Sequence, residues 1–146
     1  MEKLELKHLA PYLHHEVKFI SSMDDSDDII TNNIIWTLDG VNKLFGSYCL
    51  LTRENSDAYD INTCKLILHP LSDLIKEIQH NKQIIALINY ISTSKADKQQ
   101  MLNRIENNHS IDVFEYWKIE KLFSLHFDVF GLIKQGLAID INTLNN

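Results

Sequence analysis

The chain has 146 residues, of which 45% are hydrophobic and 23% are charged, values that fit one globular domain with an ordinary core. Its formal net charge is −6 and it holds only two arginines, Arg53 and Arg104. This balance argues against a protein that grips DNA or RNA through a basic surface of its own. The chain begins without the apolar segment of a signal peptide, and no apolar run reaches the roughly 20 residues of a membrane span. We therefore expect a cytoplasmic protein.

The first part of the chain, about residues 14–70, has the alternating pattern of β-strands. Strands are expected at Glu16–Ile20, Ile34–Leu38, Leu44–Thr52 and Cys64–Leu68. Asp39-Gly40 lies between two β-prone runs, which is typical of a two-residue hairpin turn. The pattern predicts three or four antiparallel strands.

The second part, about residues 72–135, has helical spacing. Ser72-Asp73 follows Pro70 and is suited to cap a helix. In an alternative interpretation, the polar stretch Gln79–Gln83 divides this helix into two. The buried side of that helix would carry Leu74, Ile75, Ile78, Ile85 and Ile88. Ser94 and Asp97 have the spacing of a capping box for a further helix, whose buried face would be Met101, Leu102 and Ile105. Asn107-Asn108 is expected to end it.

Residues Asp112–Gln135 are predicted to form one helix, ended by Gly136. Its apolar arc would contain Ile119, Leu122, Phe123, His126, Val129, Phe130 and Ile133. The alternative is a break at Phe127-Asp128, with Asp128 capping a second short helix. The predicted fold is α+β, a single domain over 1–146, with a small antiparallel sheet in the N-terminal half packed on three to four helices in the C-terminal half.

An acidic run, Asp24-Asp25-Ser26-Asp27-Asp28, is the strongest charge feature of the sequence. It lacks the central glycine and final glutamate of an EF-hand loop, so calcium binding is a poor fit. One interpretation is a solvated loop that the repulsion between its own charges keeps flexible. The other is a partner-binding loop, in which Asp24, Asp25, Asp27 and Asp28 attract a basic partner.

Trp117 stands out because the helical projection places it on the polar face, beside Glu120 and Lys121. Tryptophan is enriched at the centres of protein interfaces, where its large ring is a rigid anchor. We therefore assign Trp117, Glu120 and Lys121 to a candidate partner-binding surface. The competing interpretation is that the sheet or the N-terminal segment covers the indole.

Residues with catalytic or metal-binding chemistry are scattered. On a strand, His14 and Glu16 share a face but His15 does not, and two ligands do not make a zinc site. His126 is expected to be a buried histidine that bonds to backbone. Cys49 and Cys64 have no metal spacing and are expected to be small buried side chains. With no recognisable catalytic or phosphate-binding motif, we expect no enzyme, no metal and no cofactor.

Three stretches carry a resemblance to a known group of proteins. They are His8–Leu13 (HLAPYL), Leu68–Leu74 (LHPLSDL), and His126–Ile133 (HFDVFGLI) continued by Gly136–Asn142 (GLAIDIN). Together they resemble small, uncharacterised proteins common in phages and prophages of Bacteroidetes, although that group usually has arginine where His69 stands and tryptophan where Leu125 stands. No functional residue is carried over from the group.

The resemblance implies a biological context. Small acidic phage proteins often counter host defence, and RNA-guided ribonucleases of type VI-B are frequent in those hosts. The expected function is therefore that of an anti-CRISPR-like inhibitor, whose partner is a bacterial CRISPR effector with or without its guide RNA. The alternative is a phage accessory or assembly protein that acts by protein-protein or self association.

Overall fold

The computed structural model describes residues 3–22, 34–44, 46–75, 77–80, 83–107, 109, 111 and 113–145. The strands are β1 Lys18–Ser21, β2 Trp36–Leu44, β3 Ser47–Thr52, β4 Ala58–Asp60, β5 Cys64–Leu68, β6 Glu77–His80, β7 Gln83–Ala86 and β8 Ala138–Asp140. The α-helices are α1 Leu6–Leu9, α2 Leu87–Ile91, α3 Lys95–Glu106 and α4 Tyr116–Ser124. Short 3₁₀ helices cover Ala10–Tyr12, Ile61–Thr63, Leu71–Ile75 and Ile141–Asn145.

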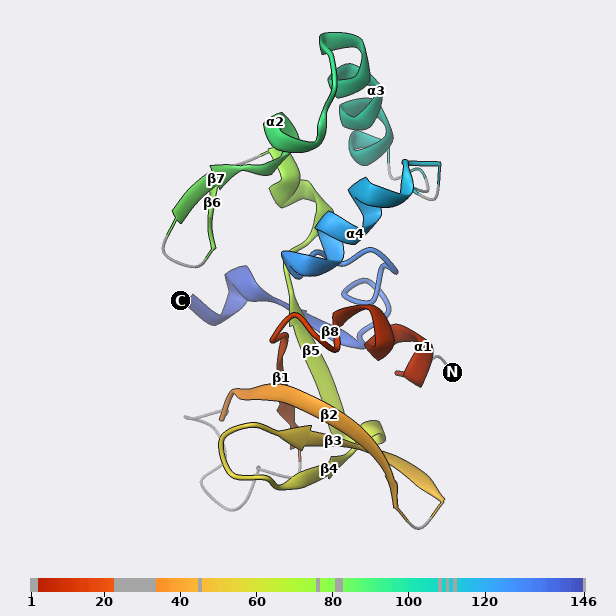
Figure 1. Cartoon of the computed structure of the whole chain (residues 1–146), viewed down its shortest axis with the longest axis vertical. Coiled ribbons are helices and arrows are strands. Elements are labelled where there is room, and N and C mark those ends of the chain that lie inside the picture. Colours follow the sequence, from red (N-terminus) through yellow and green to blue (C-terminus); the bar gives the residue numbers. More distant parts are fainter. Residues whose placement is uncertain are drawn as a thin grey trace.

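Strands β1 to β4 lie at one end of an elongated molecule, α2 and α3 lie at the other, and α4, α1 and β8 lie between them (Figure 1). The main sheet has six strands in the order β4-β3-β2-β1-β5-β8. The α+β class is thereby confirmed. The sheet is mixed rather than antiparallel, because β8 from the C-terminal part pairs parallel to β5. A parallel pair requires a long crossover connection, and here the helical part of the chain provides it.

The predicted hairpin turn at Asp39-Gly40 is wrong. Both residues lie inside β2, where the pairing with β3 shifts register between Leu38 and Gly40. Glycine is tolerated at such irregularities as well as in turns. Strand β2 continues to Leu44, which pairs with Ser47, and Gly46 beside that pair has φ +83°. The chain therefore reverses several residues later than its most turn-like dipeptide.

The predicted helix after Pro70 is also wrong. Leu71–Ile75 forms a 3₁₀ helix, and the antiparallel strands β6 and β7 follow as a separate two-stranded sheet. The pairing runs from Glu77 with Ala86 to His80 with Gln83, so Gln79, His80 and Gln83 of the polar stretch lie in paired strands. Isoleucine is β-branched and favours strands, a preference that competes here with the helical spacing of the same residues.

Helix α3 is confirmed within a residue of its predicted ends. The Ser94 hydroxyl accepts a hydrogen bond from the Asp97 amide at 3.0 Å, and Asn107 is the C-cap. The capping box is displaced by one position, since the Asp97 carboxylate accepts from the Thr93 amide at 2.8 Å. Met101 and Ile105 are buried as expected, whereas Leu102 is half-buried.

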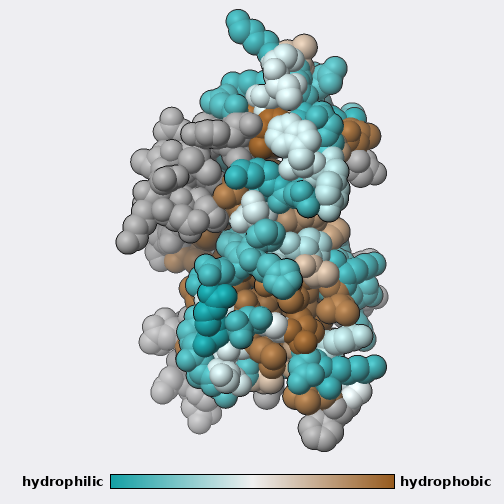
Figure 2. Space-filling model, in the orientation of Figure 1, coloured by the Kyte–Doolittle hydropathy of each residue, from teal (hydrophilic) through white to brown (hydrophobic). Residues whose placement is uncertain are grey.

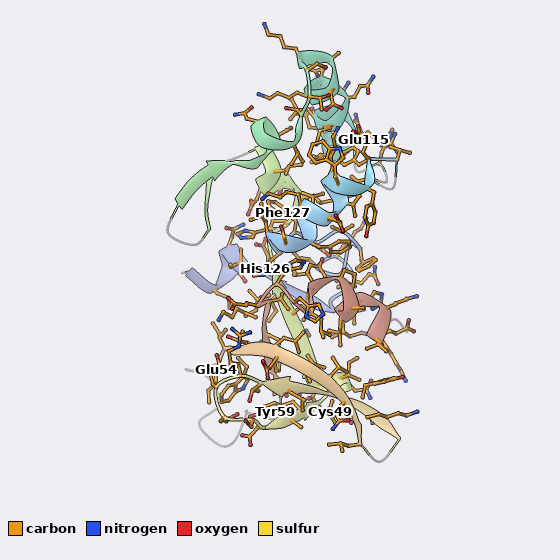
Figure 3. All side chains as sticks on the ribbon, in the orientation of Figure 1. Cys49, Glu54, Tyr59, Glu115, His126 and Phe127 are labelled. Atoms are coloured by element: carbon orange, nitrogen blue, oxygen red, sulfur yellow. The ribbon has the colours of Figure 1, made fainter. Side chains whose placement is uncertain are left out.

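The helix predicted over Asp112–Gln135 ends early. Helix α4 stops at Ser124, and His126 takes a left-handed conformation with φ +64°. His69 pairs with the chain at this change of direction: its amide donates to the His126 carbonyl at 2.8 Å, and its carbonyl accepts from the Asp128 amide at 2.9 Å. Figure 3 shows His126 and Phe127 just beyond the end of α4. Turns, not a second helix, follow from Asp128 to Gly136.

Two hydrophobic clusters stabilise the fold. The first lies between the main sheet, the N-terminal segment and the turns near the C-terminus, and includes Leu9, Tyr12, Phe19, Leu50, Leu66 and Leu132. The second joins α2, α3 and α4, and includes Leu74, Ile91, Met101, Leu122 and Phe127. Tyr12 connects them, because its buried hydroxyl donates to the Phe127 carbonyl at 2.6 Å.

Candidate binding groove

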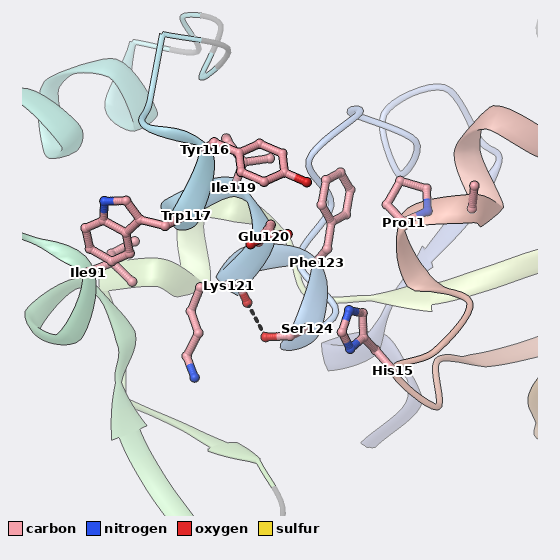
Figure 4. A pocket seen from close by; sticks show the side chains of 11 residues that line it. Pro11, His15, Ile91, Tyr116, Trp117, Ile119, Glu120, Lys121, Phe123 and Ser124 are labelled. Atoms are coloured by element: carbon pink, nitrogen blue, oxygen red, sulfur yellow. Dashed lines mark hydrogen bonds between the residues drawn. The ribbon is translucent and has the colours of Figure 1, made fainter.

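A groove of about 760 Å³ crosses the outer face of α4. Its lining residues are Ala10, Pro11 and His15 from the N-terminal segment, Ile91 from α2, and Tyr116, Trp117, Ile119, Glu120, Lys121, Phe123 and Ser124 from α4. We call it the α4 groove. In Figure 4 the Trp117 and Ile91 side chains lie on one side of the helix, and Phe123 faces Pro11 on the other. The groove thus combines segments that are far apart in the sequence.

The structure brings together three of the residues that the sequence assigns to partner binding. Trp117, Glu120 and Lys121 all line the α4 groove. Lys118 and Leu122 point inward from the opposite side of α4 and are buried, as helical periodicity requires. Trp117 remains 44% exposed, so its side chain is only partly covered.

Aromatic side chains continue from the groove towards α1. Tyr116 is 76% exposed, and the Phe123 ring meets the Phe130 ring at a centroid distance of 5.5 Å. Phe130 in turn meets His8 of α1 edge to face at 5.4 Å. The sequence placed Phe123 and Phe130 on a buried arc, which is wrong for Phe130, because the chain leaves the helical path after Ser124 and exposes 39% of that residue.

Charged groups in the groove lie beside these rings. The Glu120 carboxylate beside the Tyr116 hydroxyl raises the pKa of Tyr116. The Lys121 side chain extends away from Tyr116 and Phe123, while its carbonyl accepts from the Ser124 hydroxyl at 2.7 Å (Figure 4). An exposed carboxylate next to exposed aromatic faces favours a cationic group of a partner, which both can attract.

On the face shown in Figure 2, apolar residues gather mainly over the sheet, whereas hydrophilic and near-neutral residues cover the region of α4. Aromatic rings set among polar side chains are typical of surfaces that exist both free and in complexes. The composition of the α4 groove therefore fits recognition of a partner better than permanent burial.

The histidines and the single glutamate of the segment His14-His15-Glu16 do not form a common site. Glu16 bonds Arg53 at 2.7 Å, an interaction that lowers the pKa of Glu16, whereas His15 lines the groove. His126 is half-buried rather than buried, and its ring contacts the His15 carbonyl oxygen. Within the described part of the chain, no three His, Cys, Asp or Glu side chains form a group that could hold a metal ion.

Neither Cys49 nor Cys64 forms a disulfide. Cys64 is buried as expected, but Cys49 is only half-buried. The four aspartates of the acidic run, Asp24, Asp25, Asp27 and Asp28, lie outside the described residues. Their assignment to partner binding stays a prediction.

Sequence reasoning missed the buried polar side chains. His69 Nδ1 lies 3.5 Å from Asp73 Oδ2, and the Asn142 amide donates to that same carboxylate oxygen at 2.8 Å. Lys118 is buried against Asp97 and Glu115. The spacing of His69 and Asp73, four residues apart across Pro70, was a local signal for the first pair. Lys118 has no comparable signal, because Asp97 lies on another helix.

Comparisons with protein-family models, with curated proteins and with solved structures find no match for this chain. None of the helices in the described ranges is long and apolar enough to cross a membrane.

Proposed function

We propose that the protein binds a bacterial RNA-guided nuclease effector through the α4 groove and inhibits it, as an anti-CRISPR-like protein of phage or prophage origin. The observation that carries the binding role is the exposure of both Tyr116 and Trp117 on the α4 groove. Binding energy in protein complexes is concentrated in a few such tyrosine, tryptophan and arginine residues. The proposed action is occupancy of the partner's surface in the bacterial cytoplasm, and it requires no catalytic residue, metal or cofactor.

Charge complementarity supports an effector as the partner. The chain has a net charge of −6, and Glu120 places a carboxylate within the groove. An RNA-guided effector must hold its guide in a positively charged channel, and an acidic protein is attracted to such a surface. The resemblance to phage proteins of Bacteroidetes favours an effector of type VI-B.

The decisive experiment co-expresses the tagged protein with a type VI-B effector and its guide in a bacterium. We expect the effector to co-purify and RNA-targeting interference to be lost. Tyr116→Ala and Trp117→Ala should each weaken effector binding at least about tenfold, equivalent to about 1.4 kcal/mol. Tyr48→Ala is the matched control, since Tyr48 is an exposed tyrosine of β3 outside the groove. Unchanged affinity in both groove variants would exclude the α4 groove as the contact.

The contribution of charge is tested separately by association kinetics. Replacing Asp24, Asp25, Asp27 and Asp28 with asparagine should slow association and leave dissociation nearly unchanged, because exposed charges act mainly by steering. Raising the salt concentration should slow the association of the unmodified protein with the effector in the same way. Association rates that do not respond to either change would reject an electrostatic approach through the acidic run.

Self-association is the second candidate, because Val113 and Tyr116 are apolar or aromatic residues that remain well exposed. Light scattering distinguishes a self-associating protein from a monomer. A dimer that Tyr116→Ala dissociates, together with failure of the effector to co-purify, would favour a phage accessory or assembly protein. A monomer that binds the effector would support inhibition.

A further inference from the structure

Lys118 is a buried lysine in the first turn of α4, a helix whose outer face carries the groove. Only 1% of its side chain is exposed, and its ammonium group lies 2.7 and 2.9 Å from the two carboxylate oxygens of Asp97. It also lies 3.1 Å from Oε1 of Glu115, the residue just before α4. The lysine thereby connects the start of α3 to the start of α4.

The Glu115 carboxylate joins Lys118 to Trp117, which lines the α4 groove. While Oε1 faces Lys118, Oε2 accepts a hydrogen bond from Trp117 Nε1 at 2.9 Å. The Lys118 ammonium also lies 5.7 Å from the centre of the Trp117 ring, within the range of a cation-π contact. The indole is therefore held at its nitrogen by Glu115 and at its ring by Lys118.

The Asp97 carboxylate, which the Lys118 ammonium bonds, is itself held in place by hydrogen bonds. Its carboxylate accepts hydrogen bonds from the amide and the hydroxyl of Thr93, and its amide donates to Ser94. Burial by itself lowers the pKa of Lys118, but the bonds to Asp97 and Glu115 outweigh it and hold that pKa above its usual value. The pKa of Asp97 is lowered by its bond to Lys118. Lys118 and Asp97 are therefore both charged at neutral pH.

We propose that Lys118 is a positioning residue, which holds Trp117 through Glu115 as a preformed anchor of the α4 groove. A surface tryptophan without such contacts samples several rotamers and must lose that freedom on binding. Here the freedom is lost when the protein folds. That Trp117 contacts a partner rests on the proposed function. The fixed orientation of its side chain is a property of the free protein, and it is tested without a partner.

The test measures Trp117 fluorescence in a Trp36→Phe background, which leaves Trp117 as the single tryptophan. In the free protein, Lys118→Met should lower the nanosecond anisotropy of Trp117 and increase its quenching by acrylamide. Lys98→Met is the matched control, because Lys98 is a lysine of α3 whose ammonium bonds Asn89 at 2.8 Å, not Trp117. It should leave both quantities unchanged.

A second pair of variants keeps the proposal testable should Lys118→Met fail to fold. Glu115 has a side chain 57% exposed, so changes there leave the core intact. Glu115→Ala removes the acceptor of the indole and should free Trp117 as Lys118→Met does. Glu115→Gln retains an oxygen acceptor but loses the ion pair, and should give an intermediate anisotropy.

The proposal is overturned if Trp117 keeps its anisotropy in folded Lys118→Met, or in Glu115→Ala, with circular dichroism as the measure of folding. Because no partner is added, a groove that fails to bind an effector leaves this result unaffected. Where an effector does bind, Lys118→Met should weaken its binding while Lys98→Met should not.

Discussion

Asp128 replaces a stretch of expected helix with a hydrogen-bonded turn. Its side chain is buried, and its two oxygens accept from the amides of Leu132 at 2.7 Å and Ile133 at 2.9 Å. Burial raises the pKa of Asp128, although these backbone bonds oppose the change. A residue that the sequence offers as a helix cap therefore caps a turn, because its carboxylate finds the same kind of amide donors there.

Asp128→Ala should lower the free energy of unfolding by about 2 to 4 kcal/mol, since it leaves the buried Leu132 amide and the partly buried Ile133 amide without this acceptor. Asp128→Asn retains one acceptor oxygen and should lose less. Urea unfolding followed by circular dichroism measures both variants. Equal midpoints for the alanine variant and the unmodified protein would show that the turn does not depend on this carboxylate.

The burial of His69 makes the stability of the protein depend on pH. Burial lowers the pKa of His69 below its ordinary value of about 6.5, even though Asp73 and Asp140 attract the protonated ring. The unfolded chain therefore takes up a proton at a higher pH than the native protein. The contribution of His69 to stability is complete above pH 6.5 and is lost as the pH falls through its native pKa.

We expect the unfolding free energy of the unmodified protein to fall between pH 7 and pH 5, and His69→Phe to fall less over the same interval. Phenylalanine keeps a ring against Phe127, whose centroid lies 5.3 Å from that of His69. His109→Phe is a suitable control, because His109 is an exposed histidine. Parallel pH profiles for the unmodified protein and His69→Phe would contradict the prediction.

At the scale of elements, a short segment of sequence predicts an element correctly when the hydrogen bonds of that element form within the segment itself. Helix α3 has a serine N-cap and an asparagine C-cap, and both were recognisable in the sequence. The β6–β7 hairpin was not recognised, because its isoleucines repeat at intervals that fit a helix as well as a strand. The register of a strand depends on its neighbour, which no short window of sequence contains.

Ser94→Ala should destabilise the protein by about 1 kcal/mol, the usual cost of losing an N-cap hydroxyl. Ser94→Asn should keep most of the stability, because the amide oxygen can accept from Asp97 in the same way. Thermal unfolding of the three proteins measures the difference. If alanine and asparagine behave alike, the Ser94 hydroxyl does not stabilise α3.

At the scale of the whole molecule, a few buried contacts join the sheet end to the helical end. Tyr12 belongs to the first hydrophobic cluster and Phe127 to the second, and the Tyr12 hydroxyl reaches the Phe127 carbonyl. The Tyr12 ring also meets Phe123 edge to face at 5.0 Å. Since Phe123 lines the α4 groove, the junction between the clusters also supports one wall of the candidate site.

Tyr12→Phe should lower the unfolding free energy by about 1 kcal/mol, because the Phe127 carbonyl loses one of its two donors and keeps only the Val129 amide. It should also increase hydrogen exchange at the amides of Phe127 and Val129. Tyr48→Phe removes a hydroxyl from a partly exposed tyrosine and should change neither quantity. Unaltered exchange in Tyr12→Phe would mean that the junction is held by ring packing alone.

The amino-acid sequence by itself determined the α+β class, the strands β1 and β5, the helix α3, and the common face of Trp117, Glu120 and Lys121. Each of these follows from alternation, helical periodicity or capping within one short segment. Only the tertiary structure decided where α4 ends, that β8 joins the sheet beside β5, and that Pro11 and Ile91 form walls for the groove. Those features depend on hydrogen bonds and contacts between segments distant in the chain, such as His69 with His126, and local patterns carry no record of them.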